Sequence, residues 1–280
     1  MTRRSWSNRV FWALCWLAFL LIAAPAVAVI VSVFHQALPS LGWSTFTKGT
    51  NSVGLQNAIL GTLLLLLGVF IVAGIIGVAA GIYLAEFSTP RLGGSLRFFS
   101  EVLAGMPSIV IGYIGYIALV VGFHWGFSLL AAVFALSALV LPYIVKTTEV
   151  ALRAVPSPLR EASAALGVSR TKTIGRVLLP PALPGIVSGL IVALAISTGE
   201  TAPLLFTAGF SDKNPSFSLF HHQIGYLTGV TFTDISLPGA RAHATAAAAG
   251  AVTLMILIIL IALGRIVSAR ARKATARMAL

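Results

Sequence analysis

The sequence has few charged residues. Of its 280 residues only 9% are Asp, Glu, Lys or Arg, whereas soluble globular proteins average about 25%. The hydrophobic share is 58% and the mean hydropathy is +0.98, so the chain cannot cover a water-exposed surface, which excludes a soluble domain and a disordered segment. Cys15 is the single cysteine, which excludes a disulfide-stabilised secreted scaffold. The remaining class is a membrane protein with several spans.

Common catalytic and metal-binding motifs are also missing. The chain contains no Walker A glycine-rich loop, no H-E-x-x-H pair and no G-x-S-x-G elbow. The sequence therefore lacks a nucleotide site, and its few scattered Glu residues do not form the polar cluster that an enzyme needs. His221, His222 and His243 fit no standard metal-ligand spacing, so we expect them to pack at an interface.

Long apolar runs recur along the chain. A helix needs about 20 mostly apolar residues to cross the roughly 30 Å hydrocarbon core. Six runs meet this requirement, so we predict an all-α, polytopic membrane helix bundle with six transmembrane helices. The predicted spans are Val10–Phe34, Leu55–Tyr83, Phe98–Val121, Phe127–Val145, Gly185–Phe206 and His243–Val267.

The basic residues lie mostly on one side of this predicted bundle. A net charge of +12 would suggest a nucleic-acid partner in a soluble chain. Sixteen of the 19 basic residues, however, lie at the two termini and in the loops after the second and fourth spans, and only Lys48, Lys213 and Arg241 lie on the other side. The positive-inside rule then places both termini in the cytoplasm, and the excess charge reports orientation. We therefore expect no nucleic-acid partner.

The first span has a second interpretation. Ala24-Pro25-Ala26 after a basic N-terminus resembles a signal-peptide cleavage site. The apolar run continues to Phe34, which is too long for a usual signal-peptide core, so we favour a retained span. Cleavage would leave the orientation of the other five spans unchanged.

Small residues and prolines indicate how the spans pack. Glycines repeat at helical spacing in two spans, where they let helix backbones approach closely: Gly77 with Gly81, and Gly185 with Gly189. Prolines lie inside or near the ends of four spans, where each can kink a helix: Pro25, Pro107, Pro142 and Pro203. Bundle packing is the expected role of each.

The longest polar segment is the predicted loop 146–184, which we expect to hold two short helices. Ser157-Pro158 is typical of an N-cap followed by Pro at the first helical position. Gly167 is typical of the residue after a helix, where φ is positive. A second helix is expected over 169–179, ended by Pro180-Pro181.

The first of these two helices carries small side chains. Ala162, Ser163, Ala164 and Ala165 give it a surface that can enter a partner's groove. The alternative is an amphipathic helix that lies on lipid headgroups. Because this helix lacks Trp and Phe and its apolar stripe is thin, we favour the partner.

The spacing of this loop is similar to that of a known family. Glu161-Ala162-Ser163 is followed after three residues by Gly167 and, nine residues later, by the Val-Leu-Leu-Pro of 177–180. This pattern resembles the EAA loop of type I ABC importer permeases, with Ser163 in place of Ala and Val177 in place of Ile. The resemblance extends from about 55 to 265. It implies the type I ABC importer (MetI-like) fold, with the loop as a coupling helix docked on an ATPase subunit.

Two further stretches resemble permeases of phosphate importers: 101–112, with Met106-Pro107-Ser108, and 199–208, with Gly199-Glu200-Thr201-Ala202-Pro203. The resemblance implies a permease subunit of an ATP-driven phosphate importer in the inner membrane, forming half of the translocation path. The implied partners are a homologous permease, two ATPase subunits that bind ATP-Mg, an extracytoplasmic phosphate-binding protein and membrane lipid. No cofactor is expected on this chain, which would itself be non-catalytic.

The resemblance also implies domains and residue roles. The expected parts are an N-terminal helix and outer loop at 1–54, the permease domain at 55–267 and a basic cytoplasmic tail at 268–280. The residues assigned to the coupling helix and ATPase docking are Arg160, Glu161, Ala162, Ser163, Gly167, Leu179 and Pro180. The residues assigned to the translocation path are Glu200, Thr201, Pro203 and Ser108.

Glu200 is the acidic residue placed deepest in a predicted span. An ionised side chain at the bilayer centre costs about 2.5–3.5 kcal/mol on insertion scales, so such a position is expected to be functional. The alternative is a protonated or interfacial Glu200. Permeases of phosphate importers often carry an Arg one turn earlier, whereas this chain has Ile196-Ser197-Thr198 there.

We therefore expect an Arg of the partner permease to neutralise Glu200. Ser197, Thr198, Thr201 and backbone N–H groups near Pro203 would supply neutral donors to an anion. Near the cytoplasmic end of the third span, Glu101 is expected to face water or to pair with Arg97 four residues earlier.

Two alternatives to phosphate import stay open. One is the same architecture with another oxyanion, such as sulfate or molybdate, and the ligand of the binding protein distinguishes it. The other is an ion-coupled secondary carrier, which would work without ATPase partners.

Overall fold

The computed structural model describes residues 2–52, 54–216 and 218–278, and side chains over 8–52, 54–216 and 218–270. All regular structure in these ranges is helical, which confirms the predicted all-α class. The α-helices are α1 (Thr2–Ala37), α2 (Trp43–Thr47), α3 (Gln56–Glu86), α4 (Pro90–Gly105), α5 (Ser108–Gly115), α6 (Leu129–Arg153), α7 (Ser157–Ala165), α8 (Arg170–Thr173), α9 (Leu179–Gly199), α10 (Ala202–Thr207), α11 (Leu227–Ile235) and α12 (Ala240–Met278). The other turns are the 3₁₀ turn η1 (Thr50–Ser52) and the π-helical η2 (Tyr116–Gly122) and η3 (Ile174–Leu178).

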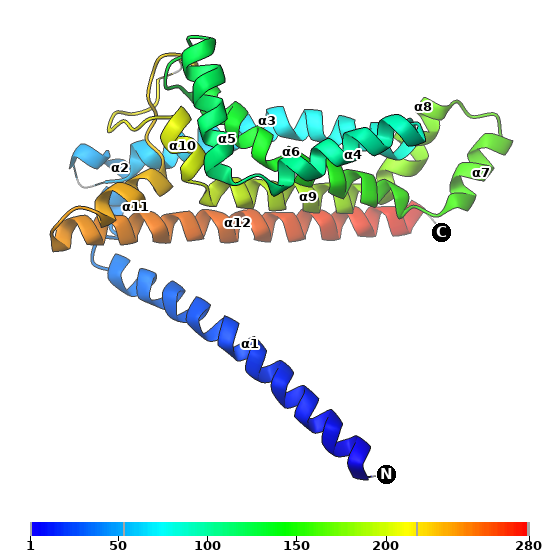
Figure 1. Ribbon diagram of the computed structural model, residues 1–280, viewed down its shortest axis with the longest axis horizontal. Coiled ribbons are helices and arrows are strands. Elements are labelled where there is room, and N and C mark those ends of the chain that lie inside the picture. The colour runs from blue at the N-terminus through cyan, green and yellow to red at the C-terminus, as the bar shows by residue number, and fades with distance from the viewer. Residues whose placement is uncertain (1, 53, 217, 279–280) are drawn as a thin grey trace.

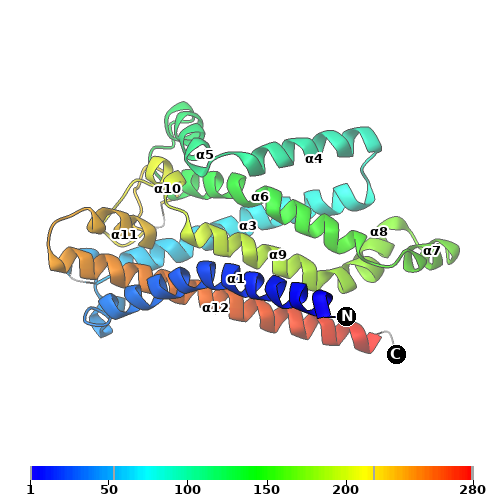
Figure 2. The ribbon, with the colours of Figure 1, turned by 60° about the horizontal axis from the view of Figure 1, so that its bottom comes forward.

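Four long helices, α3, α6, α9 and α12, run side by side and form the bundle (Figure 1). Helix α4 lies along one side of it, against α6. We call the end of the bundle with α7 and α8 the α7 end, and the end with α2, α10 and α11 the α10 end. The first and last helices both point their outer termini toward the α7 end (Figures 1 and 2).

Helix α6 is the centre of the bundle because glycines let its neighbours approach. A Cβ on Gly77 of α3 would come within 2.7 Å of the Ile144 Cγ2 of α6, and one on Gly185 of α9 within 2.7 Å of the Ala151 Cβ. Real Cβ atoms essentially never show such contacts. Both glycine pairs expected from the sequence therefore face α6, and each lets a helix pack closely on it.

The predicted third span is broken rather than continuous. Helices α4 and α5–η2 meet at an angle of 101° at Met106-Pro107, and α5 turns away from the bundle (Figures 1 and 2). Pro107 has no N–H to continue the helix, and it holds Met106 in an extended conformation with ψ of 135°. Among the residues that the structure describes, five continuous helices are long and apolar enough to cross a membrane, or six if this bent pair is one span.

The predicted fifth span begins earlier and ends earlier than expected. Helices α8, η3 and α9 form one 30-residue helical run, Arg170–Gly199. Pro180-Pro181 was expected to end a helix, and that expectation is wrong: both prolines lie in the first turn of α9. The π-helical turn η3 directly before them changes the hydrogen-bond pattern, so the missing proline N–H groups leave the helix continuous.

The other helices extend beyond the predicted spans. Helix α6 continues to Arg153, so it takes the first eight residues of the predicted loop 146–184. Helix α12 continues through most of the predicted tail to Met278, and residues 279–280 lie outside the described ranges. The part of the predicted loop that lies outside the long bundle helices is therefore shorter than the sequence suggests, and it consists mainly of α7.

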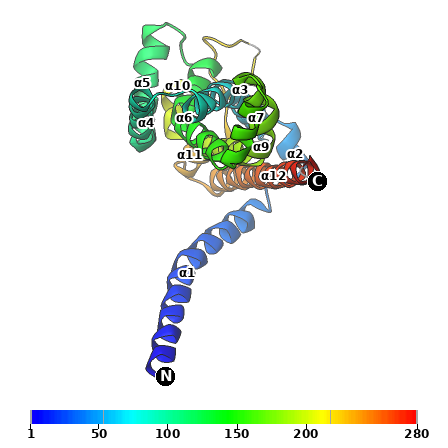
Figure 3. The same ribbon diagram turned by 90° about the vertical axis from the view of Figure 1, so that its right-hand side faces the viewer.

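Helix α1 stands apart from the bundle. Its last turns pack on α12, where Ala37 joins a small apolar cluster with Leu55 and Val252. The rest of the helix diverges, as the view along the bundle shows (Figure 3). Its most apolar stretch has no residue buried within this chain. The N-terminal helix therefore leaves an apolar surface, with Trp12 and Trp16 exposed.

We predict that Gly77→Val destabilises the permease bundle, because its side chain would overlap Ile144 of α6. Overpacking of a filled interior costs about 1–3 kcal/mol. The matched control is Gly94→Val on α4, where an added Cβ meets nothing within 4 Å. Thermal unfolding of the detergent-solubilised protein should show a lower midpoint for Gly77→Val alone; equal midpoints for both variants would contradict the packing of α3 on α6.

Candidate functional site

Helix α7 ends in a Schellman motif at Gly167. The Val168 N–H donates to the Ser163 carbonyl at 3.0 Å and the Gly167 N–H donates to the Ala164 carbonyl at 3.0 Å. Gly167 has φ of +67°, a conformation that costs other residues roughly 1–2 kcal/mol. The predicted helix end and its positive φ are therefore confirmed, and both fix the direction in which the chain leaves α7.

Helix α7 presents mostly small side chains to solvent. Glu161 and Ala162 are exposed, and Leu166 just beyond the last turn is 81% exposed. Ser163 is buried against the rest of the chain, so it does not belong to the exposed surface expected from the sequence. Leu166 was not among the predicted residues, and its exposed side chain adds apolar area beside the exposed face of α7.

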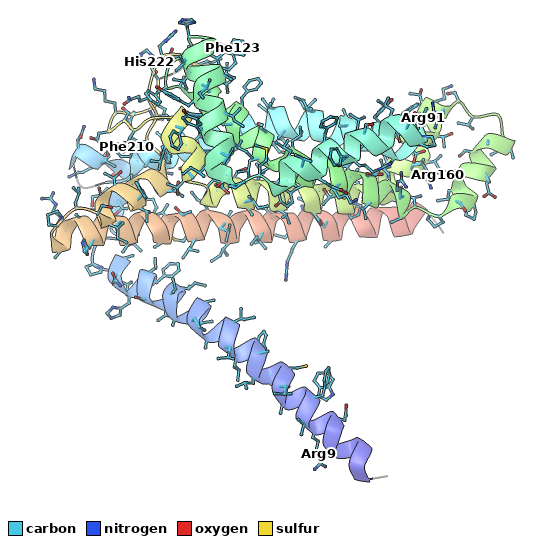
Figure 4. All side chains as sticks on the ribbon, in the orientation of Figure 1. Arg9, Arg91, Phe123, Arg160, Phe210 and His222 are labelled. Carbon is cyan, nitrogen blue, oxygen red and sulfur yellow. The ribbon has the colours of Figure 1, made fainter. Side chains whose placement is uncertain are left out.

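Arg160 points into the bundle rather than outward. Its Nη2 donates to Glu86 Oε1 of α3 and to the Leu152 carbonyl of α6, both at 2.8 Å, and its Nη1 donates to the Val155 carbonyl at 2.7 Å. Figure 4 labels Arg160 where α7 joins the bundle. This residue was assigned to ATPase docking with the rest of α7. Its side chain instead attaches α7 to the ends of two bundle helices.

Leu179 and Pro180 also lie away from the exposed surface of α7. They form the first turn of α9, and Leu179 packs on an apolar cluster that contains Leu152 and Ile174. Nearby, the Arg170 guanidinium lies 4.6 Å above the ring centroid of Phe87, a cation–π contact between α8 and the end of α3. These contacts hold α8 and the start of α9, the segment through which the loop leads back into the bundle.

The second site is a pair of helix breaks near the α10 end. Helix α9 ends at Gly199, Glu200 is extended with ψ of 134°, and α10 begins at Ala202. Ser108, the first residue of α5, is a side-chain hydrogen-bond partner of Glu200. The predicted residues Ser108 and Glu200 therefore come together, and they join the broken third and fifth spans.

The segments after the two breaks are packed closely. A Cβ on Gly112 of α5 would come within 2.6 Å of the Pro203 Cα of α10. Pro203 is buried in this contact, and its carbonyl accepts from Thr207 Oγ1 at 2.8 Å. Thr228 Oγ1 donates to the Glu200 carbonyl at 2.8 Å. The break thus has a fixed shape, built from α5, α10 and α11.

Two hydroxyls expected to serve as donors are already used. Ser197 Oγ donates to the Ala193 carbonyl at 2.9 Å and Thr198 Oγ1 to the Leu194 carbonyl at 2.7 Å, and both side chains are buried. Their protons are directed into their own helix, which corrects the expectation that they face an anion. Thr201 has no such bond among the described contacts and is partly exposed at the break.

Arg97 pairs with a residue that the sequence reasoning passed over. Its Nε lies 2.9 Å from Glu149 Oε1 of α6, and no ion pair is found for Glu101 within the described ranges. Of the two expectations for Glu101, the pair with Arg97 is therefore wrong, and the exposed position is confirmed. Glu149 follows an apolar run and precedes Arg153 by four residues, a charge pattern that was a usable signal.

The histidines at the α10 end lie apart and bond to backbone. His222 Nδ1 is 3.1 Å from the Phe220 carbonyl and His243 Nε2 is 3.2 Å from the Leu237 carbonyl. Over the described part of the chain, no cluster of three or more His, Cys, Asp or Glu is arranged to hold a metal ion. Phe123 and His222 are labelled at this end in Figure 4.

A comparison with protein families identifies this architecture. Residues 77–273 match the binding-protein-dependent transport system inner membrane component. The chain belongs to this family. The permease is thus an ABC permease subunit and a multi-pass protein of the inner membrane, as its apolar helices require.

Known relatives of this permease are similar over most of its length. It is 42% identical over 273 residues to the phosphate transport system permease protein PstA 2 of Mycobacterium bovis, and this alignment covers 97% of this chain and 91% of the relative. It is 40% identical over 200 residues to PstA of Haemophilus influenzae, with 71% and 67% covered. The inward-facing MetNI methionine ABC transporter has a similar fold, with a TM-score of 0.60 at 22% identity over 79% of this chain and 96% of the other. The predicted MetI-like fold is therefore confirmed.

We predict that Glu200→Gln lowers transport by the assembled permease at least tenfold, because the break loses its carboxylate. Ser108→Ala should lower transport less, since it removes one hydrogen-bond partner and keeps the charge. The measurement is substrate uptake at matched expression, with Thr253→Val on α12, away from the break, as the control. Wild-type uptake by both Glu200→Gln and Glu200→Ala would exclude a role for this side chain.

Proposed function

We propose that this chain is a permease subunit of an ATP-driven phosphate importer. The proposal is supported by relatives named phosphate transport system permease proteins. The single structural observation that carries it is α7: a short exposed helix, ended by Gly167 and attached through Arg160 to two bundle helices. A subunit that receives mechanical work from a partner needs such an element, and this sequence contains no Walker A loop.

The proposed orientation places the α7 end and both termini in the cytoplasm. It is supported by the distribution of basic residues, since sixteen of 19 belong to segments at that end. It also puts the exposed surface of α7, with Ala162 and Leu166, in the compartment where ATP is available. On this account two partner ATPase subunits bind ATP-Mg, and the permease binds no cofactor itself.

The proposed translocation path passes the break at Glu200. A homologous permease would supply the other half of the path and an Arg that neutralises Glu200, because the described residues give Glu200 no basic ion-pair partner. Phosphate would arrive from an extracytoplasmic binding protein at the α10 end. The bend at Pro107 and the break at Glu200 supply irregular backbone inside the membrane, which proteins tolerate where it is buried or lines a cavity.

Two alternatives remain to be separated by experiment. Sulfate or molybdate would use the same architecture, and competition with phosphate uptake distinguishes them. An ion-coupled carrier would transport without ATPase subunits, so uptake that follows an ion gradient and ignores ATP would exclude the importer.

We predict ATP-dependent phosphate uptake when the permease is reconstituted in liposomes with its partner permease, ATPase subunits and binding protein. Gly167→Trp should abolish this uptake while the complex still assembles, because it strains the positive-φ residue and adds bulk beside the docking surface. ATP hydrolysis is measured in parallel with phosphate entry.

The control for Gly167→Trp is Gly105→Trp, which lies near the bend of α4 and whose added Cβ also meets nothing within 4 Å. That variant should keep its response of ATP hydrolysis to the binding protein, whereas Gly167→Trp should lose it. Intact ATP-dependent uptake in Gly167→Trp would contradict the coupling role of α7.

A further inference from the structure

Two arginines, one on α7 and one on α4, each form hydrogen bonds to both α3 and α6 near the ends of these helices. Arg160 of α7 donates to the carboxylate of Glu86 in α3, to the Leu152 carbonyl in α6 and to the Val155 carbonyl just after α6. Arg97 of α4 takes the carboxylate of Glu149 from α6 at 2.9 Å, and its Nη2 donates to the Leu84 carbonyl of α3 at 3.3 Å. Each guanidinium therefore uses its fork to bridge both helices, one from α7 and one from α4.

Glu149 is the buried member of this arrangement. Its side chain is only 5% exposed, and its Oε1 lies 2.9 Å from both Arg97 Nε and Arg153 Nη2. A carboxylate removed from water needs such counter-charges to remain ionised. Glu149 also lies less than one turn before Leu152, whose carbonyl accepts from Arg160. The last two turns of α6 thus carry the contacts of both arginines.

Arg97 supplies polar contacts that hold the middle of helix α4. Gly93 is the one residue of this helix that is buried, and a cavity of about 190 Å³ separates α4 from α6 beside Arg97, Glu101 and Glu149. Near the end of the helix, Leu103 is partly buried and packs on the apolar core of the bundle. Side-chain packing is therefore incomplete beside Arg97, and its polar contacts hold this part of α4 against α6.

The far end of α4 leads to the break at Glu200. After the bend at Met106-Pro107 the chain continues directly into Ser108, the hydrogen-bond partner of Glu200. Helix α4 is a single uninterrupted helix of 16 residues. A change in its contact with α6 at Arg97 therefore displaces Ser108 relative to Glu200, through a continuous chain of covalent and polar contacts.

We propose that Arg97 and Glu149 are positioning residues for transport, and that they link the coupling helix to the break at Glu200. Movement of α7 displaces the ends of α3 and α6 through Arg160, and Arg97 passes that displacement to α4. Neither residue contacts the transported anion in this role. The inference rests on the proposed importer function and adds to it a route within the chain.

The test measures phosphate entry and ATP hydrolysis in liposomes for Arg97→Met, Glu149→Gln and Arg97→Lys. We expect the ratio of phosphate moved to ATP hydrolysed to fall at least fivefold in each. Lysine lacks the fork that serves Glu149 and Leu84 together, so Arg97→Lys tests the geometry while keeping the charge. The matched control is Arg91→Met, an exposed arginine one and a half turns earlier on α4, which should leave the ratio unchanged.

A second measurement reports position directly. With Cys15→Ser as background, spin labels at Gly94→Cys on α4 and Leu183→Cys on α9, both at exposed sites, should give a narrow distance distribution. Arg97→Lys should broaden it, and Arg91→Met should not. If Arg97→Lys changed neither the ratio of phosphate moved to ATP hydrolysed nor the spin-label distance distribution, the inference would be overturned, although the wild type would still be an importer. If the wild type showed no ATP-dependent uptake, the proposed function itself would be refuted.

Discussion

Arg160 makes the contact on which the rest of the account depends, because it joins the exposed helix α7 to α3 and α6 of the bundle. Its guanidinium donates to Glu86, to the Leu152 carbonyl in the last turn of α6 and to the Val155 carbonyl just beyond that helix, at distances of 2.7 to 2.8 Å. Charge-assisted bonds of this kind are stronger and more directional than neutral ones. A force applied to α7 is therefore able to reach α3 and α6 through these bonds as well as through the chain connection at 154–156. The close packing of α3 on α6, which Gly77 permits, lets both helices respond together.

The two ends of the bundle differ in the contacts that hold their helices together. At the α7 end, two partly exposed arginines, Arg97 and Arg160, bridge the ends of α3 and α6. At the α10 end, prolines break two spans, and the freed segments α5 and α10 pack through Gly112 on Pro203. Between these ends lie apolar helices whose interiors hold few charges. We propose that the ion pairs at one end and the broken spans at the other let the two ends affect each other.

Local features were predictable from the sequence, and long-range ones were not. The positive φ of Gly167 follows from neighbouring residues and is found where expected. Helix α7 begins one residue earlier than predicted, because its N-cap is Pro156 and not Ser157. The direction of Arg160 and the Arg97–Glu149 pair depend on which helices meet, and the sequence alone left that open. The bend at Pro107 was expected only as a kink, because a hydropathy window does not distinguish a straight apolar helix from one that turns by 101°.

The most direct test of the account is cross-linking from α7 to an ATPase subunit in the native membrane. With Cys15→Ser as background, a cysteine reagent attached at Leu166→Cys, which is 81% exposed beside α7, should join the permease to its ATPase partner. The same reagent at Phe123→Cys, 65% exposed at the opposite end, should not. Cross-links from Leu166→Cys alone are the predicted result; cross-links from Phe123→Cys with none from Leu166→Cys would contradict both the orientation and the coupling role of α7.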